Sequence, residues 1–299
     1  MRFKVDVYEQ LLILSSILWG TSFVASKIGV GHVDPFYFGM MRWVIGAELL
    51  LLIAFLTKKF RPEIFRNKLI WGIGLINAVG LTLQNVGMTQ TTATNTVLLV
   101  DINVVFVVII SYFVLAEKIT RYTVYGLLFG LVGVGFVSTG GDLSQLTQGS
   151  FIGNILVFSA GVVWAFYIVF QKKLVGPRTE PLMISAAVVT STAIFSLPIA
   201  FLFTTNYALD LTGSVIMVYL GTVCTGGAWL LYIMGLRGKG ATESSIILLL
   251  EIVFAMAFAY LVLSEMPGWP TAIGGAFIVL SILFVSARPN GNEREKKEG

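Results

Sequence analysis

The sequence predicts an all-α membrane protein with ten transmembrane helices, on the basis of its composition, its long apolar stretches and the sorting of its charges. Of its 299 residues, 56% are hydrophobic and only 12% are charged, and the mean hydropathy is +0.87. A soluble domain carries about 25% charged and roughly 45–50% apolar residues. A soluble fold of this length could not hide so much apolar surface, so we expect lipid to surround most of the chain.

Ten apolar stretches are long enough to cross a bilayer, which takes about 20 residues of helix. They cover residues 8–28, 35–57, 68–88, 92–115, 121–139, 151–171, 180–203, 212–236, 241–263 and 268–287. All prolines except Pro198 fall at or between the ends of these stretches, where they do not interrupt a helix. Continuous apolar runs argue against short alternating strands.

The Lys and Arg residues provide an independent test of these spans. With the N-terminus placed in the cytoplasm, 18 of the 20 basic residues fall in the N-terminal arm, the even-numbered loops and the C-terminal tail. The other two, Lys27 and Arg42, lie within spans. Cytoplasmic loops carry an excess of Lys and Arg, so we predict cytoplasmic termini in a multi-pass protein of the plasma (inner) membrane.

An internal repeat relates the two halves of the chain at a shift of 148 residues. The shift pairs Ala93 with Ala241, Phe106 with Phe254, Tyr112 with Tyr260, Leu115 with Leu263, and Glu117 with Glu265. A shift of 145 residues pairs Trp19 with Trp164 and Lys27 with Lys172. We therefore predict two repeats, residues 1–145 and 146–288, followed by a disordered cytoplasmic tail at 289–299.

Each predicted repeat contains five spans, and an odd number makes the two copies enter the membrane from opposite faces. Inverted repeats are related by a pseudo-two-fold axis in the membrane plane, and their substrate site lies near the midplane where the copies meet. One asymmetric unit used in both orientations gives two related states that open to opposite sides. The predicted architecture therefore favours alternating access.

Several short motifs occur in a fixed order along nearly the whole chain. Trp19-Gly20 is followed by Ser22, Phe23 and Lys27; Pro35 precedes Arg42; Ala93 leads to Leu115-Ala116-Glu117; and Leu248-Leu249-Leu250-Glu251 leads to Leu263-Ser264-Glu265. In order, spacing and duplication these motifs resemble the drug/metabolite transporter superfamily, and within it the exporters with two EamA repeats. The resemblance implies ten helices, cytoplasmic termini, a central cavity lined mainly by spans one to four and six to nine, and export of metabolites such as amino acids.

The sequence departs from this family pattern in the middle of the fourth and ninth spans, where the family commonly has proline. Here Val104 follows Asn103 and Ile252 follows Glu251. Without these prolines we expect no hinge of that origin and a straighter ninth helix.

Four ionisable residues lie deep within the spans: Arg42 and Glu48 on the second, Asp101 on the fourth and Glu251 on the ninth. Such groups cost about 2.5–3.5 kcal/mol each on insertion scales, so they normally face the bundle interior and pair. One arginine cannot neutralise three acids, and burial without a partner favours the protonated form of a carboxyl group. We expect Asp101 and Glu251 to contact substrate or a coupling proton, with Glu48 as a further proton-coupling candidate. The alternative is that Arg42 neutralises one acid and the group only specifies packing.

Aromatic and neutral polar residues within the spans complete the predicted substrate site. The candidates are Trp19, Ser22, Gln84, Asn95, Asn103, Trp164, Tyr167, Tyr232 and Ser245, together with Arg42, Asp101 and Glu251. Indole faces suit flat or cationic solutes. Core packing or an interfacial aromatic belt is the alternative for each aromatic residue.

Other patterns exclude further chemistry. One cysteine, Cys224, and one histidine, His32, provide no disulfide and no His/Cys metal cluster, so we predict neither a metal nor a cofactor. The glycines at 126, 130, 133 and 135 lie in an apolar span without a preceding strand, which favours helix packing over a dinucleotide site. Glu117 is expected to be structural, beside a helix start.

The function that these features favour is a secondary transporter that exports small zwitterionic or cationic metabolites, with amino acids foremost, either coupled to protons or by facilitated exchange. A multidrug exporter of cationic compounds and a membrane-embedded enzyme are the alternatives. The expected partners are the lipid bilayer and a small-molecule metabolite, without nucleic acid, and the protein is expected to be a monomer or a homodimer.

Overall fold

The computed structural model describes residues 6–91, 96, 99–147, 150–176, 179–263 and 268–286, and within these ranges the regular structure is helical. The α-helices are α1 (Val7–Gly29), α2 (Pro35–Leu56), α3 (Lys68–Met88), α5 (Asn103–Leu115), α6 (Arg121–Thr139), α7 (Phe151–Leu174), α8 (Pro181–Phe203), α9 (Leu211–Tyr219), α10 (Ala228–Gly238), α11 (Ala241–Leu248), α12 (Leu250–Leu263) and α13 (Trp269–Ser286). Short 3₁₀ helices, η1 (Pro62–Arg66) and η2 (Leu143–Thr147), and a π-helix, η3 (Leu220–Gly227), complete the described elements.

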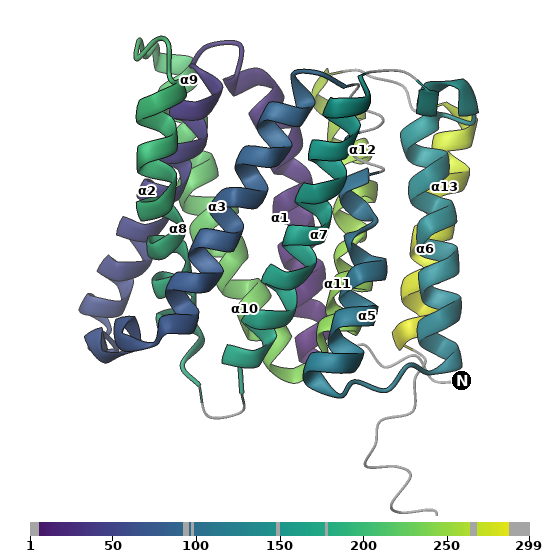
Figure 1. Cartoon of the computed structure of the whole chain (residues 1–299), viewed down its shortest axis with the longest axis horizontal. Coiled ribbons are helices and arrows are strands. Elements are labelled where there is room, and N and C mark those ends of the chain that lie inside the picture. Colours follow the sequence, from purple (N-terminus) through teal and green to yellow (C-terminus); the bar gives the residue numbers. More distant parts are fainter. Residues whose placement is uncertain are drawn as a thin grey trace, which may run out of the picture.

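Nine helical segments in the described ranges are long and apolar enough to cross a membrane, and Leu99–Leu115 is a shorter apolar helix in the position of the fourth predicted span. The helices run alternately up and down, with α1 behind α3 and α7 in this view, and the start of α1 lies at the same end as the close of α13 (Figure 1). The prediction of an all-helical membrane protein is therefore confirmed.

Local sequence sets the helix ends. Asp6 accepts hydrogen bonds from the backbone of Tyr8 and Glu9 and starts α1 in a capping box. Asp34 accepts hydrogen bonds from the backbone of Phe36 and Tyr37 at the start of α2, with Pro35 in the first turn. Gly140 ends α6 in the left-handed conformation, with φ 58°, which costs glycine little.

The helix contacts of one repeat recur in the other with the partners exchanged. α1 packs against α12 and α10, and α7 packs correspondingly against α5 and α3. The contact of α2 with η3 in the eighth span corresponds to the contact of α8 with α3. Three further pairs each join one span to its equivalent in the other repeat: α2–α8, α6–α13 and α5–α11. These reciprocal contacts are the ones that a pseudo-two-fold relation between two repeats produces.

α6 and α13 form a closely packed pair through small residues. A Cβ at Gly133 would lie 2.7 Å from the carbonyl oxygen of Gly274, and one at Gly126 would lie 3.1 Å from that of Ser281. Gly130 likewise faces α13, so the predicted packing role is confirmed for three of the four glycines. It is wrong for Gly135, where a Cβ would meet nothing within 4 Å.

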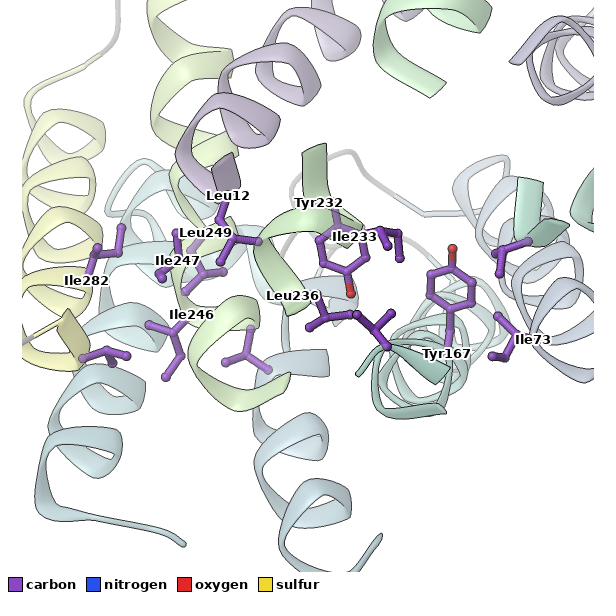
Figure 2. Packing of buried hydrophobic residues seen from close by; sticks show 14 of the residues in the cluster. Leu12, Ile73, Tyr167, Tyr232, Ile233, Leu236, Ile246, Ile247, Leu249 and Ile282 are labelled. Atoms are coloured by element: carbon purple, nitrogen blue, oxygen red, sulfur yellow. The ribbon is translucent and has the colours of Figure 1, made fainter. Parts of the chain in front are cut away.

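The core lies where α1, α7, α10 and α11 meet. Leu12, Ile233, Leu236 and Ile246 are fully buried there, and Tyr167 projects into the same region from α7 (Figure 2). Because these residues come from both repeats, the core lies at the junction of the two halves.

The expectation of a straighter ninth helix is wrong. That span is interrupted between α11 and α12 at Leu249, and the fourth span is interrupted at Ile102. At each break a 3₁₀-type hydrogen bond replaces an α-helical one: Ile252 N–H bonds to Leu249 O at 3.2 Å, and Val105 N–H bonds to Ile102 O at 3.0 Å. Proline is therefore not what breaks these helices.

Glycines on neighbouring helices lie against both broken segments. A Cβ at Gly20 of α1 would lie 2.6 Å from the Cβ of Phe254 and 3.1 Å from the carbonyl oxygen of Glu251. A Cβ at Gly161 of α7 would lie 2.8 Å from the carbonyl oxygen of Val100. The neighbouring helices thus pack directly onto backbone beside each break, and tertiary packing accommodates the irregular turns.

Candidate functional site

Three ionisable side chains come together within the membrane-spanning part of the bundle. Arg42 lies on α2, Asp101 is the last helical residue before the break at Ile102, and Glu251 lies two residues after the break at Leu249. Glu251 interacts electrostatically with both Asp101 and Arg42. The two helix breaks therefore place one acid each close enough for the acids to interact, and one of them, Glu251, also interacts with Arg42.

Within the described part of the chain, none of these three charged side chains forms an ion pair. Asp101 and Glu251 accept no hydrogen bond there, and no Lys or Arg nitrogen lies within 4.0 Å of either carboxylate. All three side chains are half-buried rather than sealed. Unpaired charges at bilayer depth are costly, and an accessible space between helices that admits water or a solute lowers that cost.

Arg42 is held by one hydrogen bond from its inner nitrogen. Its Nε donates to Oγ1 of Thr225 in η3 at 2.7 Å, and Thr225 is fully buried. Close approach of α2 to η3 makes this bond, since a Cβ at Gly46 would lie 2.8 Å from Cγ2 of Thr225 and 3.0 Å from the carbonyl oxygen of Gly221. Arg42 and Gly46 are four positions apart and share that helix face.

An aromatic cluster lies beside this charged group. Trp229 is at its centre, with ring centroids 4.8 Å from Trp19, 5.0 Å from Trp43, 6.2 Å from Tyr167 and 6.4 Å from Tyr232. Edge-to-face contacts of this kind are favourable, and such rings present faces to a flat or cationic group.

The polar atoms of the cluster are only partly satisfied. Nε1 of Trp19 donates to the carbonyl oxygen of Cys224 at 2.9 Å. Nε1 of Trp229 donates to the hydroxyl of Tyr167 at 2.8 Å. The hydroxyl of Tyr232 and Oε1 of Gln171 are buried without a hydrogen-bond partner. In Figure 2 the hydroxyls of Tyr167 and Tyr232 lie among Ile233 and Leu236, inside the bundle. A buried unpaired polar group is costly, so this site favours a hydrogen-bonding ligand or water.

Comparison with known proteins identifies the family that has this architecture. A family model described as the EamA-like transporter family matches residues 8–139 and again residues 151–287. The chain belongs to the EamA-like transporter family. It is therefore a multi-pass membrane transporter rather than an enzyme, and the resemblance drawn from its motifs is confirmed.

Relatives of this EamA-like transporter are similar over their full length. An uncharacterized transporter of Archaeoglobus fulgidus is 24% identical over 93% of this chain and 96% of the relative. The uncharacterized transporter YoaV of Bacillus subtilis is 27% identical over 91% and 94%. A crystal structure at 18% identity superposes with a TM-score of 0.80 over 94% of this chain and 98% of the other, which shows the shared fold.

Among the other predicted site residues, Glu48 of the EamA-like transporter does not face the charged group. It is exposed, and Leu52 and Phe55, which share its face of α2, are also exposed. The expectation that Glu48 faces the bundle interior is wrong, because six positions along an α-helix leave it about 120° around the helix from Arg42.

The neutral polar candidates differ in their hydrogen bonds and in their burial. Ser22 and Ser245 each donate to a carbonyl of their own helix, that of Trp19 at 2.7 Å and that of Thr242 at 2.9 Å. Asn103 is half-buried just after the break in the fourth span. Asn95 lies outside the described residues.

Two further candidates lie between α3 and α7 of the EamA-like bundle. Gln84 lies on the face of α3 that carries Gly80 and Gly87, both of which approach α7. Trp164 packs at Gly80, and its buried Nε1 has no hydrogen-bond partner. The structure therefore brings Trp19, but not Trp164, into the aromatic cluster formed around Trp229.

A second charged group, the basal ion cluster, closes the end of the bundle where α1 begins. Nζ of Lys239 lies 2.8 Å from Glu9, 2.9 Å from Asp6 and 2.7 Å from Glu243. Burial alone would lower the pKa of Lys239, but the three carboxylates raise it above its ordinary value. Partial burial acts to raise the pKa of Asp6, but hydrogen bonds from Glu9 N–H and Lys239 lower it overall.

Glu117 lies at the same end of the bundle, but it caps a different helix from the one predicted. Its carboxylate accepts hydrogen bonds from the backbone of Ala241 at 2.6 Å and Thr242 at 3.1 Å, which caps the start of α11. The structural role is confirmed, but Glu117 stabilises the ninth span of the transporter rather than the helix that follows it in sequence.

Sequence reasoning missed Thr225, Trp43 and the basal ion cluster. Thr225 and Trp43 are ordinary residues of apolar spans, and only packing brings them to Arg42 and Trp229. The run Leu220–Gly227, with three glycines in eight residues, was the available signal that the eighth span is irregular.

Proposed function

We propose that this transporter is an exporter of small zwitterionic or cationic metabolites, with amino acids as the leading class, that works by alternating access about a cavity in the middle of the membrane. The observation that carries the proposal is the unpaired group of Arg42, Asp101 and Glu251, which one half of the bundle cannot form alone. An amino acid has one carboxylate and one ammonium group, and this group offers one positive and two negative side chains.

Asp101 and Glu251 are also the residues that we propose for proton coupling. Two acids that repel each other across a shared space are favoured to hold one proton between them, and an ammonium group that enters the site would compete for their charge. Competition between proton and substrate for the same acids is sufficient to couple their movements in opposite directions.

The test is exchange of a labelled amino acid in proteoliposomes that contain the purified protein, with and without an imposed pH gradient. We expect Asp101→Asn and Glu251→Gln to lose most of the gradient-driven flux. Glu48→Gln is the matched control, because Glu48 lies on the outer face of α2 and should leave the flux close to that of the wild type. Normal gradient-driven flux in both acid variants would contradict the assignment.

The aromatic cluster favours a second candidate, export of bulky cationic compounds. Trp19, Trp229 and Tyr232 offer ring faces beside two acids, a combination that binds cations. Expression should then raise resistance to cationic dyes and drugs, whereas an amino acid exporter should raise resistance to toxic amino acid analogues.

For orientation we propose that both ends of the chain lie in the cytoplasm. The sorting of Lys and Arg supports this assignment. Cysteines placed singly in a Cys224→Ser background, at Lys59 and at Asn206, should separate the two sides: only the one at 206 should react with an impermeant maleimide on intact cells.

A further inference from the structure

The eighth span of this protein is irregular at the point where it meets the charged site. η3 (Leu220–Gly227) is π-helical, and it ends with the i→i+5 hydrogen bond from Ala228 N–H to Val223 O. Its equivalent in the other repeat, α3, is an unbroken α-helix. π-helical turns are rare and costly, and they concentrate at functional sites.

This segment contacts the site through two hydrogen bonds. The carbonyl oxygen of Cys224 accepts from Trp19 of the aromatic cluster at 2.9 Å, and Oγ1 of the next residue, Thr225, accepts from Nε of Arg42 at 2.7 Å. One turn of η3 therefore links the aromatic cluster to the arginine. Gly46 and Gly221 allow the close approach that this link needs.

The equivalent helix crossing in the other half of the bundle carries no charge. There α3 meets α8 through a hydrogen bond from Nδ2 of Asn77 to Oγ1 of Thr192 at 3.3 Å, and both side chains are buried. The pseudo-two-fold relation is thus broken at this position, because one crossing holds a cation and the other a neutral pair. The site therefore combines one cation on α2 with two acids on the fourth and ninth spans.

We propose that Thr225 is a positioning residue, which holds Arg42 so that its terminal nitrogens bind the carboxylate of a solute whose ammonium group faces Asp101 and Glu251. A guanidinium is planar, and fixing Nε sets the direction of the other two nitrogens. Within the described residues those two nitrogens make no hydrogen bond or ion pair, so they are free for a carboxylate. The inference rests on the proposed function and deepens it, because it assigns which end of a zwitterion binds where.

The test compares two solutes that differ only in the carboxylate, L-phenylalanine and phenethylamine. In proteoliposomes, the apparent KM for labelled L-phenylalanine and the inhibition constant of phenethylamine are measured for wild type, Thr225→Val and Thr225→Ser. We expect Thr225→Val to raise the KM for L-phenylalanine about tenfold, since it removes a hydrogen bond to a charged group, while the inhibition constant of phenethylamine changes less than about twofold. Thr225→Ser keeps the hydroxyl and should restore the KM.

The matched control is Thr222→Val in the same π-helical segment. The hydroxyl of Thr222 donates to the carbonyl of Val218 at 2.7 Å and does not contact Arg42. Its loss should leave the ratio of the two constants unchanged, and the melting temperatures of all variants report on folding.

Three outcomes decide the matter. Selective loss of L-phenylalanine affinity in Thr225→Val, with rescue by serine, supports the positioning role. Equal loss for both solutes, or no change, overturns it while leaving the proposed function standing. If the wild type binds neither solute, the positioning role falls, and the exchange of labelled amino acids described above decides separately whether the proposed function stands.

Discussion

Lys239 and Glu9 lie 230 positions apart in the chain and form a buried ion pair of 2.8 Å. The pair joins the first turn of α1 to the connection between α10 and α11, and so joins the two repeats. Lys239 also lies 2.7 Å from Glu243. Few charged residues of the described chain are so completely enclosed: 7% of the Lys239 side chain and 4% of the Glu9 side chain are exposed.

Replacing Lys239 with methionine should strongly destabilise the protein. The change leaves buried carboxylates without their cation, which typically costs about 3–5 kcal/mol. Thermal unfolding in detergent, followed by circular dichroism, measures the effect. Lys59→Met is the control, because Lys59 forms an exposed pair with Glu180 at 3.3 Å and should change stability by less than about 1 kcal/mol. Equal melting temperatures for the two variants would contradict the assignment.

Acid should weaken the basal ion cluster through Asp6. The pKa of Asp6 is lowered in the fold, so its contribution to stability is present above its ordinary pKa of about 3.9 and is lost as the pH falls through the lower folded value. Asp6→Asn removes the titrating group, so its stability should fall less steeply between about pH 5 and pH 2 than that of the wild type. Parallel acid limbs of the two stability curves would show that Asp6 does not contribute.

Gly20 should not tolerate a side chain. A Cβ there would meet the Cβ of Phe254 at 2.6 Å and the backbone nitrogen of Ala255 at 3.0 Å, so Gly20→Ala should force α1 away from α12 at a cost of about 1–3 kcal/mol. A Cβ at Gly39 would meet nothing within 4 Å, so Gly39→Ala should stabilise α2 slightly through helix propensity. Melting temperatures that shift in the same direction for both variants would argue against the close packing seen here.

Trp19 should report on solute binding. It lies 4.8 Å from Trp229 in the aromatic cluster, and it directly precedes Gly20, which packs on the backbone of Glu251. We expect the change in tryptophan fluorescence on adding L-phenylalanine to be largely lost in Trp19→Phe. Trp269 is 74% exposed at the start of α13, so Trp269→Phe should retain the change. If Trp269→Phe loses the signal and Trp19→Phe keeps it, the solute binds elsewhere.

The helices could be predicted from the sequence because their cause is local. Each span needs a run of apolar residues to meet lipid, and prolines and caps such as Asp34-Pro35 mark the ends, so observed and predicted bounds agree within a few residues for most spans. The repeat was visible for the same reason, since equivalent positions such as Phe106 and Phe254 occupy equivalent environments. Arg42, Asp101 and Glu251 stood out because charge at bilayer depth is costly wherever it occurs.

What only the tertiary structure decided is how these local elements meet. The family prolines are absent, yet the fourth and ninth spans break at Ile102 and Leu249, where α7 and α1 bring Gly161 and Gly20 against the neighbouring backbone. The outward direction of Glu48, the hydrogen bond from Arg42 to Thr225 and the ion pair of Lys239 with Glu9 are equally non-local. The sequence by itself determined that the chain spans the membrane as two related halves, because lipid acts on each segment alone. The site was decided by the structure, because it depends on the angle and depth at which segments about 150–200 residues apart pack together.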